Sequence, residues 1–428
     1  MSSPRKVYVE VTTLCNLQCS MCVKHAQGSC IPEGHMAMEV FQSLVTGLQS
    51  VEFLVLNGIG EPLLHPDLVK MVQLARQHMP EKGIIGFQSN GLLVNDSNAE
   101  KLLVSGLDTI CLSLDNLEDT RAELRGKEHS LSPVINAVKS LDRARNKSAR
   151  PFQLGIEVVI SRDNMHQLND LVAWAGTHRV DYILVSHLYS YDGRGQESIL
   201  FSPNTRSAVQ LYEKWQKRAQ ELGVNLENLP NVRLHYARDH QDQTLLEIGE
   251  WMRKEATASG IRMHLQNLFT FDAELAQTLG QIFEQAECAA KSLGIALHLP
   301  PKLAYEEKER HCFFMDEQAS FVDQYGNISP CHFLWHTFRC QVNNEPLLVE
   351  HHTYGNVQDE SLEEIWQKKS YKEFRQEATQ SSYSTCWSCT PGPCANLLKQ
   401  NAMDIRDCHG SQVPCGHCMW SIGWTRCL

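Results

Sequence analysis

The feature that most constrains the fold of this chain is a regular alternation of strand-like and helix-like segments before residue 190. Apolar runs that suit β-strands recur at 7–12, 51–56, 84–87, 108–114, 154–160 and 182–186. Helical patterns lie between them, for example over 38–48, 66–78 and 133–145, and several begin at a proline or an acidic residue. Six such βα units with short connections predict an α/β fold, in which a parallel sheet forms a partial (β/α)6 barrel over residues 1–192.

Three cysteines follow the first strand-like segment, in the pattern Cys15-x3-Cys19-x2-Cys22. Their thiolates can all reach one small inorganic centre. A tetrahedral zinc site would need a fourth ligand, for which His25 and Cys30 are the local candidates. An iron–sulfur cubane held by only three cysteines would instead leave one iron open to another ligand or to a substrate.

Polar motifs follow the next strand-like segments, at the strand ends where parallel sheets gather functional groups. The second segment is followed by Asn-Gly-Ile-Gly-Glu-Pro over 57–62, in which glycine lets the backbone approach a ligand and Glu61 offers an acceptor for an ammonium group. A tight strand-to-helix turn without a ligand is the alternative. Gln-Ser-Asn-Gly over 88–91 and Ser-Leu-Asp over 113–115 follow the third and fourth segments.

Residues 193–311 lose the alternation and contain three helix-like segments, at 203–222, 245–259 and 273–293. Each ends near a glycine that suits a left-handed helix C-cap, namely Gly223, Gly260 and Gly294. We interpret this recurrence as repeated capping chemistry rather than as an internal repeat. The region carries no catalytic signature, so we expect a helical extension that shapes substrate entry.

Charge and hydropathy narrow the classes of partner. Lys and Arg number 39 against 50 Asp and Glu, and the net charge of −11 disfavours nucleic acid as the main partner. No run approaches the roughly 18 apolar residues of a membrane span, and the first residues lack the apolar core of a signal peptide. We therefore expect a cytoplasmic protein with no membrane partner. Its 16 cysteines then indicate metal ligation or redox chemistry rather than disulfides.

Ten of those cysteines lie from residue 312 onward, which predicts a small Cys-rich α+β domain over 312–428. Residues 321–331 suit a hairpin that turns at Gly326 and delivers a cysteine. Two four-cysteine clusters would need eight ligands, so one of nine candidates could be free, as a structural residue or as a proton or hydrogen-atom donor. Structural zinc ribbons are the alternative. With Cys340 set aside, the nine candidates are Cys312, Cys331, Cys386, Cys389, Cys394, Cys408, Cys415, Cys418 and Cys427.

The N-terminal cysteine pattern resembles the cluster loop of the radical S-adenosylmethionine (radical SAM) enzymes. The resemblance implies a 4Fe-4S cluster on Cys15, Cys19 and Cys22, with SAM at the open iron. Residues 57–62 are similar to the family's Gly-Gly-Glu-Pro motif, with Ile59 between the two glycines. That similarity implies that the motif, and Glu61 in particular, holds the SAM amino group.

Other positions carry the same resemblance more loosely. Residues 88–91 look like the family's Thr-Asn-Gly turn, and residues 113–115 look like its Ser-x-Asp pair. Arg125 would then contact the ribose or carboxylate region of SAM, although a plain surface ion pair is an open alternative. Met21 stands where many relatives carry an aromatic residue beside the adenine, and a thioether can pack there but cannot stack. The implied SAM-binding residues are Met21, Gly58, Gly60, Glu61, Ser89, Asn90, Ser113, Asp115 and Arg125.

Residues 312–428 resemble the SPASM domain, a C-terminal extension in which radical SAM enzymes bind auxiliary iron–sulfur clusters. The resemblance implies one or two auxiliary 4Fe-4S clusters. The family's middle block is commonly C-x2-C-x5-C-x3-C, whereas here Cys394 comes after four residues and Cys408 lies far beyond, which leaves the division of ligands open. The tail over 407–423 resembles that of SPASM proteins thought to mature tungsten or related metalloenzymes.

These resemblances imply an enzyme that cleaves SAM reductively to a 5′-deoxyadenosyl radical and abstracts hydrogen from a substrate, under anaerobic conditions and with a ferredoxin- or flavodoxin-type electron donor. Three hypotheses for its role follow. The first is a maturase that acts on a protein or peptide, such as a metalloenzyme or its cofactor precursor. The second is cross-linking or oxidation of a ribosomal peptide, and the third is a zinc-stabilised scaffold without chemistry.

Overall fold

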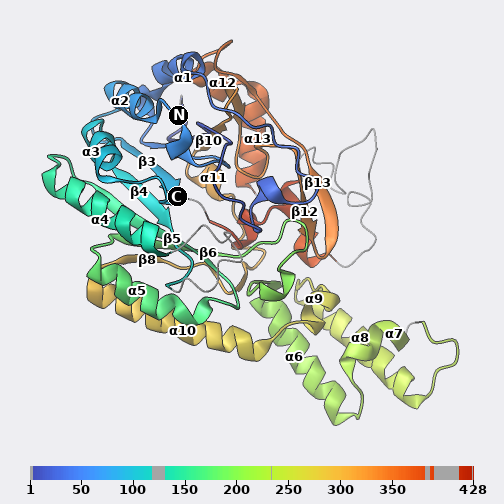
Figure 1. The fold of residues 1–428 in the computed structure, drawn as a ribbon. Helices are drawn as coiled ribbons and strands as arrows, with labels where there is room; N and C mark the ends of the chain where they lie inside the picture. The colour runs from blue at the N-terminus through green and yellow to red at the C-terminus, as the bar shows by residue number, and fades with distance from the viewer. Residues whose placement is uncertain (1–2, 118–130, 233, 381–385, 390–413, 427) are drawn as a thin grey trace.

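The computed structural model describes residues 3–117, 131–232, 234–380, 386–389, 414–426 and 428 (Figure 1). Four candidate residues of the sequence analysis lie outside the described residues: Arg125, Cys394, Cys408 and Cys427.

A ten-stranded sheet forms the centre of the described structure, with the strand order β14-β11-β10-β1-β2-β3-β4-β5-β6-β8. Strands β1 to β6 lie side by side in chain order, and each neighbouring pair is parallel, which confirms the predicted α/β sheet. All residues of β1 and β4 are buried, as expected for parallel strands covered on both faces. The bounds are β1 Lys6–Val9, β2 Phe53–Val55, β3 Ile84–Ser89, β4 Thr109–Ser113, β5 Gln153–Ile160 and β6 Tyr182–His187.

Five helices connect these strands and lie on the outside of the sheet (Figure 1). Helix α2 shows the reason, because Leu68, Met71, Val72 and Ala75 recur at the spacing of one helix face and all four are buried. The asparagine at position 95 caps α3 with a reciprocal pair of hydrogen bonds to residue 98, which starts that helix. The bounds are α1 Met38–Val45, α2 Leu68–His78, α3 Asp96–Val104, α4 Leu131–Lys147 and α5 Leu168–Thr177.

The C-terminal region adds three strands to the same sheet. β10 (Ala319–Val322) pairs in parallel with β1 along its whole length, and this pairing covers an edge that β1 would otherwise expose. β11 (Asn327–Ser329) and β14 (Gly355–Asn356) follow in antiparallel order. Gly326 lies in the turn between β10 and β11 with a φ of 87°, which confirms the predicted hairpin.

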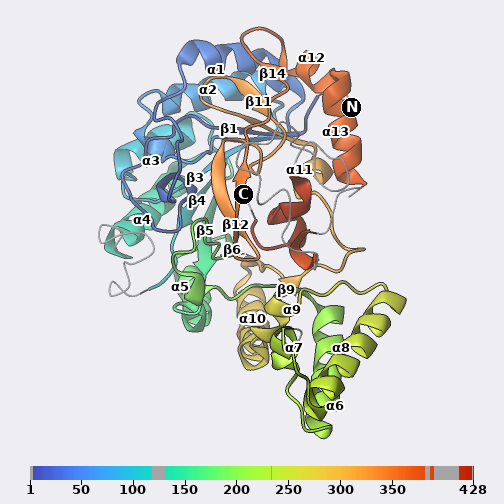
Figure 2. The ribbon, with the colours of Figure 1, turned by 90° about the vertical axis from the view of Figure 1, so that its right-hand side faces the viewer.

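The helical extension projects from one end of the sheet (Figures 1 and 2). Helices α6 to α9 share an apolar cluster of their own, whereas α10 packs along α5. Gly223, Gly260 and Gly294 have φ values of 75°, 66° and 73°, so the predicted left-handed C-caps are confirmed. The bounds are β7 Ser202–Thr205, α6 Arg206–Glu221, α7 Leu229–Val232, α8 His240–Ala258, α9 Leu265–Phe269, α10 Ala273–Leu293, β8 Ala296–His298 and β9 Leu303–Ala304.

The Cys-rich region also contains a second hairpin that the sequence analysis missed. Its turn residues Asn343 and Asn344 have φ values of 51° and 67°, as the tight turns that suit twisted hairpins require. None of the helices in the described ranges is both long and apolar enough to cross a membrane. The remaining bounds are α11 Phe313–Asp316, β12 Phe338–Val342, β13 Glu345–Val349, α12 Leu362–Gln367 and α13 Lys369–Thr379, with the short helices η7 Cys386–Ser388 and η8 Cys415–His417.

Candidate functional site

The loop after β1 carries the three cysteines of the N-terminal motif. Cys15, Cys19 and Cys22 are all partly buried, and the Cys22 amide donates to the Cys19 carbonyl at 3.1 Å. The backbone N–H of Leu17 points at Cys15 Sγ, at 3.4 Å. Burial raises the pKa of Cys22, and the nearby Cys15 thiol raises it further, so the first and third sulfur atoms of the motif lie close together.

The local candidates for a fourth zinc ligand do not complete a cage. His25 Nε2 lies 3.3 Å from the Leu17 carbonyl, and Cys30 is exposed, with its thiol 3.9 Å from the Gly28 carbonyl. Among the described residues, no group of three or more His, Cys, Asp or Glu side chains is gathered tightly enough to hold a single metal ion. A cluster of several irons spaces its ligands more widely than a single zinc ion does, so the three thiols of this loop are compatible with an iron–sulfur cluster. Met21 is partly buried beside the motif.

The glycine turn after β2 packs directly against the end of β1. A Cβ atom at Gly58 would overlap the side chain of Glu10, and one at Gly60 would overlap the carbonyls of Thr12 and Leu14. Both positions therefore need glycine for close packing between two parts of the chain, in addition to any approach to a ligand. The Glu61 amide donates to the Leu14 carbonyl at 2.7 Å and fastens the turn to the cysteine loop.

The Glu61 side chain is buried and ties this turn to the turn after β3. Its Oε1 accepts from the Leu63 amide at 3.1 Å and from Ser89 Oγ at 2.9 Å, while its Oε2 accepts from the Asn90 amide at 2.8 Å. Burial raises the pKa of this carboxyl group, and the three hydrogen bonds act in the opposite direction. The structure thus places Glu61 as an organiser of the two turns, and a direct contact with a SAM ammonium group stays a prediction.

Two further turns converge on the same end of the sheet. Asn90 Nδ2 donates to Asn16 Oδ1 at 2.7 Å, which links the turn after β3 to the cysteine loop. Ser113 ends β4 and Asp115 follows it, both side chains are buried, and Asp115 Oδ1 accepts from the Val159 amide at 2.8 Å. Asn16 was not predicted as a site residue, because a polar residue between two cysteines does not indicate which distant residue it contacts.

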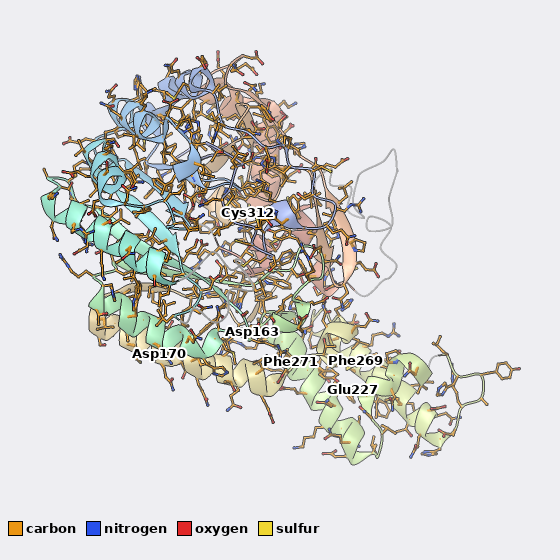
Figure 3. The ribbon with its side chains drawn as sticks, viewed as in Figure 1. Asp163, Asp170, Glu227, Phe269, Phe271 and Cys312 are labelled. Atoms are coloured by element: carbon orange, nitrogen blue, oxygen red, sulfur yellow. The ribbon has the colours of Figure 1, made fainter. Side chains whose placement is uncertain are left out.

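A second group of thiols lies in the C-terminal region, where Cys331 is buried and Cys312 and Cys418 are partly buried. Cys312 precedes α11, Cys331 follows β11 and Cys418 follows η8. Burial raises the pKa of Cys312 to about 12 and that of Cys418 to about 11, and it also raises that of Cys331. Cys418 raises the pKa of the other two thiols, so the three thiols lie within electrostatic range of one another although more than 80 residues separate two of them. Figure 3 shows Cys312 near the middle of the molecule.

The surroundings of these thiols fit an iron–sulfur cluster. Cys415 and Cys331 both raise the pKa of Tyr354, so a fourth thiol lies within electrostatic range of that tyrosine. Backbone N–H groups near each of these three thiols oppose the effect of burial on its pKa, and N–H groups close to the sulfur atoms are typical around clusters. They belong to residues 314 and 315, 333 and 334, and 420 and 421.

The other described cysteines of this region lie in different settings. Cys340 is buried in β12 and interacts with the Tyr189 hydroxyl group, and its pKa is raised to about 12 mainly by burial. Cys386 and Cys389 lie in and just after η7, where the Cys389 amide donates to the Cys386 carbonyl at 3.2 Å. Trp387 Nε1 donates to the His417 carbonyl at 3.1 Å and so joins η7 to η8.

A cavity of about 360 Å³ lies where the helical extension, the β12–β13 hairpin and η7 meet. Its walls combine aromatic rings with side-chain amides, including those of Phe271 and Asn267. Figure 3 labels Phe271, which lies near the junction with the helical extension. Asn343 Oδ1 accepts from Asn267 at 2.7 Å, and Asn343 Nδ2 donates to the carbonyls of Cys386 at 3.2 Å and Trp387 at 3.3 Å. One hairpin residue therefore connects the extension with the loop of two candidate cluster ligands.

Comparison with known families agrees with this geometry. Residues 9–175 match the model of the radical SAM superfamily, and residues 312–390 match that of the iron–sulfur cluster-binding SPASM domain. The first segment therefore belongs to the radical SAM superfamily and the second is a SPASM domain, so the chain is a radical SAM enzyme. These domains imply a 4Fe-4S cluster with SAM and auxiliary iron–sulfur clusters.

Among individual proteins, the chain is 24% identical to the tungsten-containing aldehyde ferredoxin oxidoreductase cofactor-modifying protein of Pyrococcus furiosus, over 98% of this chain and 96% of that one. It is 28% identical to pre-heme d1 synthase of Dinoroseobacter shibae over 46% of each chain. It is also 30% identical to the mycofactocin maturase MftC of Mycobacterium ulcerans, over 39% of this chain and 42% of that one. The match thus spans less than half of the last two relatives.

Solved structures share the fold at low sequence identity. Streptococcus suis SuiB superposes with a TM-score of 0.51 and 16% identity, over 94% of this chain and 75% of that one. Histidine-tagged anSMEcpe with bound AdoMet superposes with a TM-score of 0.50 and 15% identity, over 93% of this chain and 88% of that one. These similarities support the radical SAM and SPASM arrangement of the fold.

Proposed function

We propose that this chain is a radical SAM maturase that modifies a protein, a peptide or a cofactor precursor associated with a metalloenzyme. The similarity to the Pyrococcus furiosus cofactor-modifying protein supports this proposal, because it spans nearly all of both chains. The structural observation that carries it is the parallel pairing of β1 with β10. Because of this pairing, the loop of the three N-terminal cysteines and the proposed auxiliary-cluster region follow neighbouring strands of one sheet. We propose that the chain divides into three units, over residues 1–192, 193–311 and 312–428.

When bound to a 4Fe-4S cluster and reduced, SAM supplies a 5′-deoxyadenosyl radical that can remove hydrogen from a substrate C–H bond. Cys15, Cys19 and Cys22 would hold that cluster. The glycine turn, Glu61 and the Ser89–Asn90 turn form one hydrogen-bonded floor beside the cysteine loop. The role of this floor is to fix the position of SAM before its cleavage, since a small error in geometry costs much of the rate. Met21, Ser113, Asp115 and Arg125 stay proposed SAM contacts.

The auxiliary ligands divide into two sets. Cys312, Cys331, Cys415 and Cys418 are the proposed ligands of one cluster, because Cys418 interacts electrostatically with Cys312 and Cys331, and Cys415 with the same tyrosine as Cys331. Cys386 and Cys389 would begin a second set, completed by two of the cysteines outside the described residues. One of Cys394, Cys408 and Cys427 is then the ninth cysteine.

The cavity beside η7 is the proposed place for a substrate group. Its volume lies at the lower end of the range for small-molecule pockets, so it suits a small molecule or one part of a peptide rather than a folded domain. On its wall, Arg162 Nη1 lies 3.5 Å from Asp272 Oδ2, and the two side chains form an ion pair. Five aromatic and five amide side chains line much of the rest, together with the charged Glu197 and Lys302, which suits a planar group with polar edges.

Electron supply and cellular location complete the proposal. A ferredoxin- or flavodoxin-type donor would reduce the clusters under anaerobic conditions. A cytoplasmic location agrees with the many reduced thiols in the described residues, since reducing compartments keep cysteines from forming disulfides.

Anaerobic reconstitution of the full chain tests the hypothesis that it is an enzyme that cleaves SAM. Three cubane clusters predict about 12 irons per chain, and SAM with dithionite should yield 5′-deoxyadenosine. Stoichiometric zinc without SAM cleavage would instead support the scaffold hypothesis. Mass spectrometry of proteins and small peptides encoded by neighbouring genes, each incubated with enzyme and SAM, then separates a maturase substrate from a cross-linked ribosomal peptide.

A further inference from the structure

A buried acid–base pair joins the two domains beneath the cysteine loop. Glu10 directly follows β1 and is fully buried, and His336 lies between the first hairpin of the SPASM domain and β12 with 6% of its surface exposed. His336 Nε2 donates to Glu10 Oε2 at 2.9 Å. Burying a carboxylate without partners costs free energy, so this contact helps to stabilise Glu10 in its buried position.

The other carboxylate oxygen of Glu10 holds the glycine turn. Glu10 Oε1 accepts from the backbone N–H of Ile59 at 3.1 Å. Ile59 stands between Gly58 and Gly60, and a Cβ atom at Gly58 would overlap the Glu10 side chain. The carboxylate therefore lies against the middle of the turn, at a distance that only glycine permits.

The ring of His336 is itself held by the SPASM domain. It lies 6.3 Å from the ring of Phe321 in β10 and 5.4 Å from that of Trp335, measured between ring centroids. One carboxylate thus bridges a histidine whose position the SPASM domain sets and a backbone amide of the turn. The chain between Glu10 and Cys15 is short, so the same bridge stands beside the cysteine loop.

We propose that Glu10 and His336 are positioning residues through which the SPASM domain fixes the glycine turn of the radical SAM domain. The consequence for the turn itself follows from the contacts alone. The consequence for SAM affinity rests on the proposed function, in which this turn contacts SAM. The SPASM domain then has a role in preparing the SAM site that is separate from holding auxiliary clusters.

Hydrogen–deuterium exchange of the reconstituted full chain without SAM tests the bridge directly. His336→Phe keeps a ring but removes the donor, and it should speed exchange in the peptide covering 57–61 about tenfold, as expected when one buried hydrogen bond of about 1.4 kcal/mol is lost. His336→Gln can place an amide donor near the position of Nε2 and should restore slow exchange. If His336→Phe does not fold, His336→Asn serves, because its amide is too short to reach Glu10.

A matched control breaks another contact between the same domains. Lys6 Nζ lies 2.8 Å from Glu317 Oε2, near the start of β1. Lys6→Met should leave exchange over 57–61 unchanged. SAM binding by equilibrium dialysis, at equal iron content, should weaken about tenfold in His336→Phe and remain normal in Lys6→Met and His336→Gln.

The outcomes separate this inference from the proposed function. Unchanged exchange over 57–61 in a folded His336→Phe variant overturns the bridge. Exchange that rises equally in β1, β2 and the turn also overturns it, because the pair would then stabilise the domain as a whole. Faster exchange of the turn with unchanged SAM affinity supports the bridge but contradicts the proposed SAM-binding role of the turn.

Discussion

The two cysteine groups of this molecule are built in opposite ways. Cys15, Cys19 and Cys22 lie in one short loop at the end of β1 and are partly exposed. Cys312, Cys331 and Cys418 come from three separate elements and lie close together in the C-terminal region. The first group depends on a local loop, whereas the second exists only after the sheet and the C-terminal helices have packed.

This difference suggests a division of labour. A single loop can leave one side of its cluster open to SAM, while a group drawn from three elements surrounds its cluster with protein, and shielding from water is one of the factors that tune cluster potentials. Single substitutions in the two groups should therefore fail in different ways. The following predictions run from the largest expected effect to the smallest.

Cys19→Ala should abolish SAM cleavage. The formation of 5′-deoxyadenosine should fall at least about 1000-fold, because the cluster that binds SAM would no longer be held. The free energy of unfolding without clusters should change by less than about 0.5 kcal/mol, because this thiol is partly exposed. Chromatography of the reaction and denaturant unfolding measure the two quantities. Substantial SAM cleavage by this variant would mean that the local motif is not the SAM site.

Cys418→Ala should lose about four irons and all product formation while SAM cleavage continues. Because this residue packs among elements that are distant in the sequence, the fold without clusters should lose about 1 kcal/mol of stability. Iron analysis, product assays and unfolding test this together, with Cys340→Ala as a control that should keep its iron. Loss of SAM cleavage in a folded Cys418→Ala variant would show that the assembled group also serves the first step, and would break the comparison.

Gly58→Ala should weaken SAM binding about tenfold or more, because the added methyl group pushes the turn away from Glu10 at a typical cost of about 1–3 kcal/mol. Equilibrium dialysis with reconstituted enzyme measures the change. Gly193→Ala is a suitable control, since Gly193 has open space around it and its positive φ tests backbone strain alone. Equal SAM affinity in Gly58→Ala and the natural protein would contradict the proposed role of the turn.

Asn343→Gly should have the smallest effect, a few-fold loss of product formation with SAM cleavage unchanged. Glycine keeps the positive φ of the hairpin turn but removes the links to residues 267, 386 and 387, each worth about 1 kcal/mol. Single-turnover assays with substrate measure it. Asn344→Gly changes the neighbouring turn position and removes only its hydrogen bond to Gln196, so its loss of product formation should be smaller than that of Asn343→Gly.

Much of the fold was predictable because its signals are local. Six strands follow apolar runs that the buried parallel sheet requires, and each of the three glycine C-caps follows from one residue type at a helix end. The β12–β13 hairpin was not predicted because its turn is made by two asparagines. Asparagine adopts the left-handed conformation less regularly than glycine, so the residue type alone does not indicate such a turn. The bridge of Glu10 and His336 also gave no sequence signal, since its members lie 326 residues apart.

The sequence by itself determined the cysteine motif, the order of the βα units and the Cys-rich character of the C-terminal region, because residue type and short spacing carry these properties. Only the tertiary structure decided that β10 pairs with β1, that thiols at 312, 331 and 418 become neighbours, and that Glu61 turns inward to hold two turns together. The physical reason is that burial and long-range hydrogen bonds depend on which surfaces meet. The sequence pattern indicates which side chains need partners, but it does not indicate which distant residue becomes the partner of each.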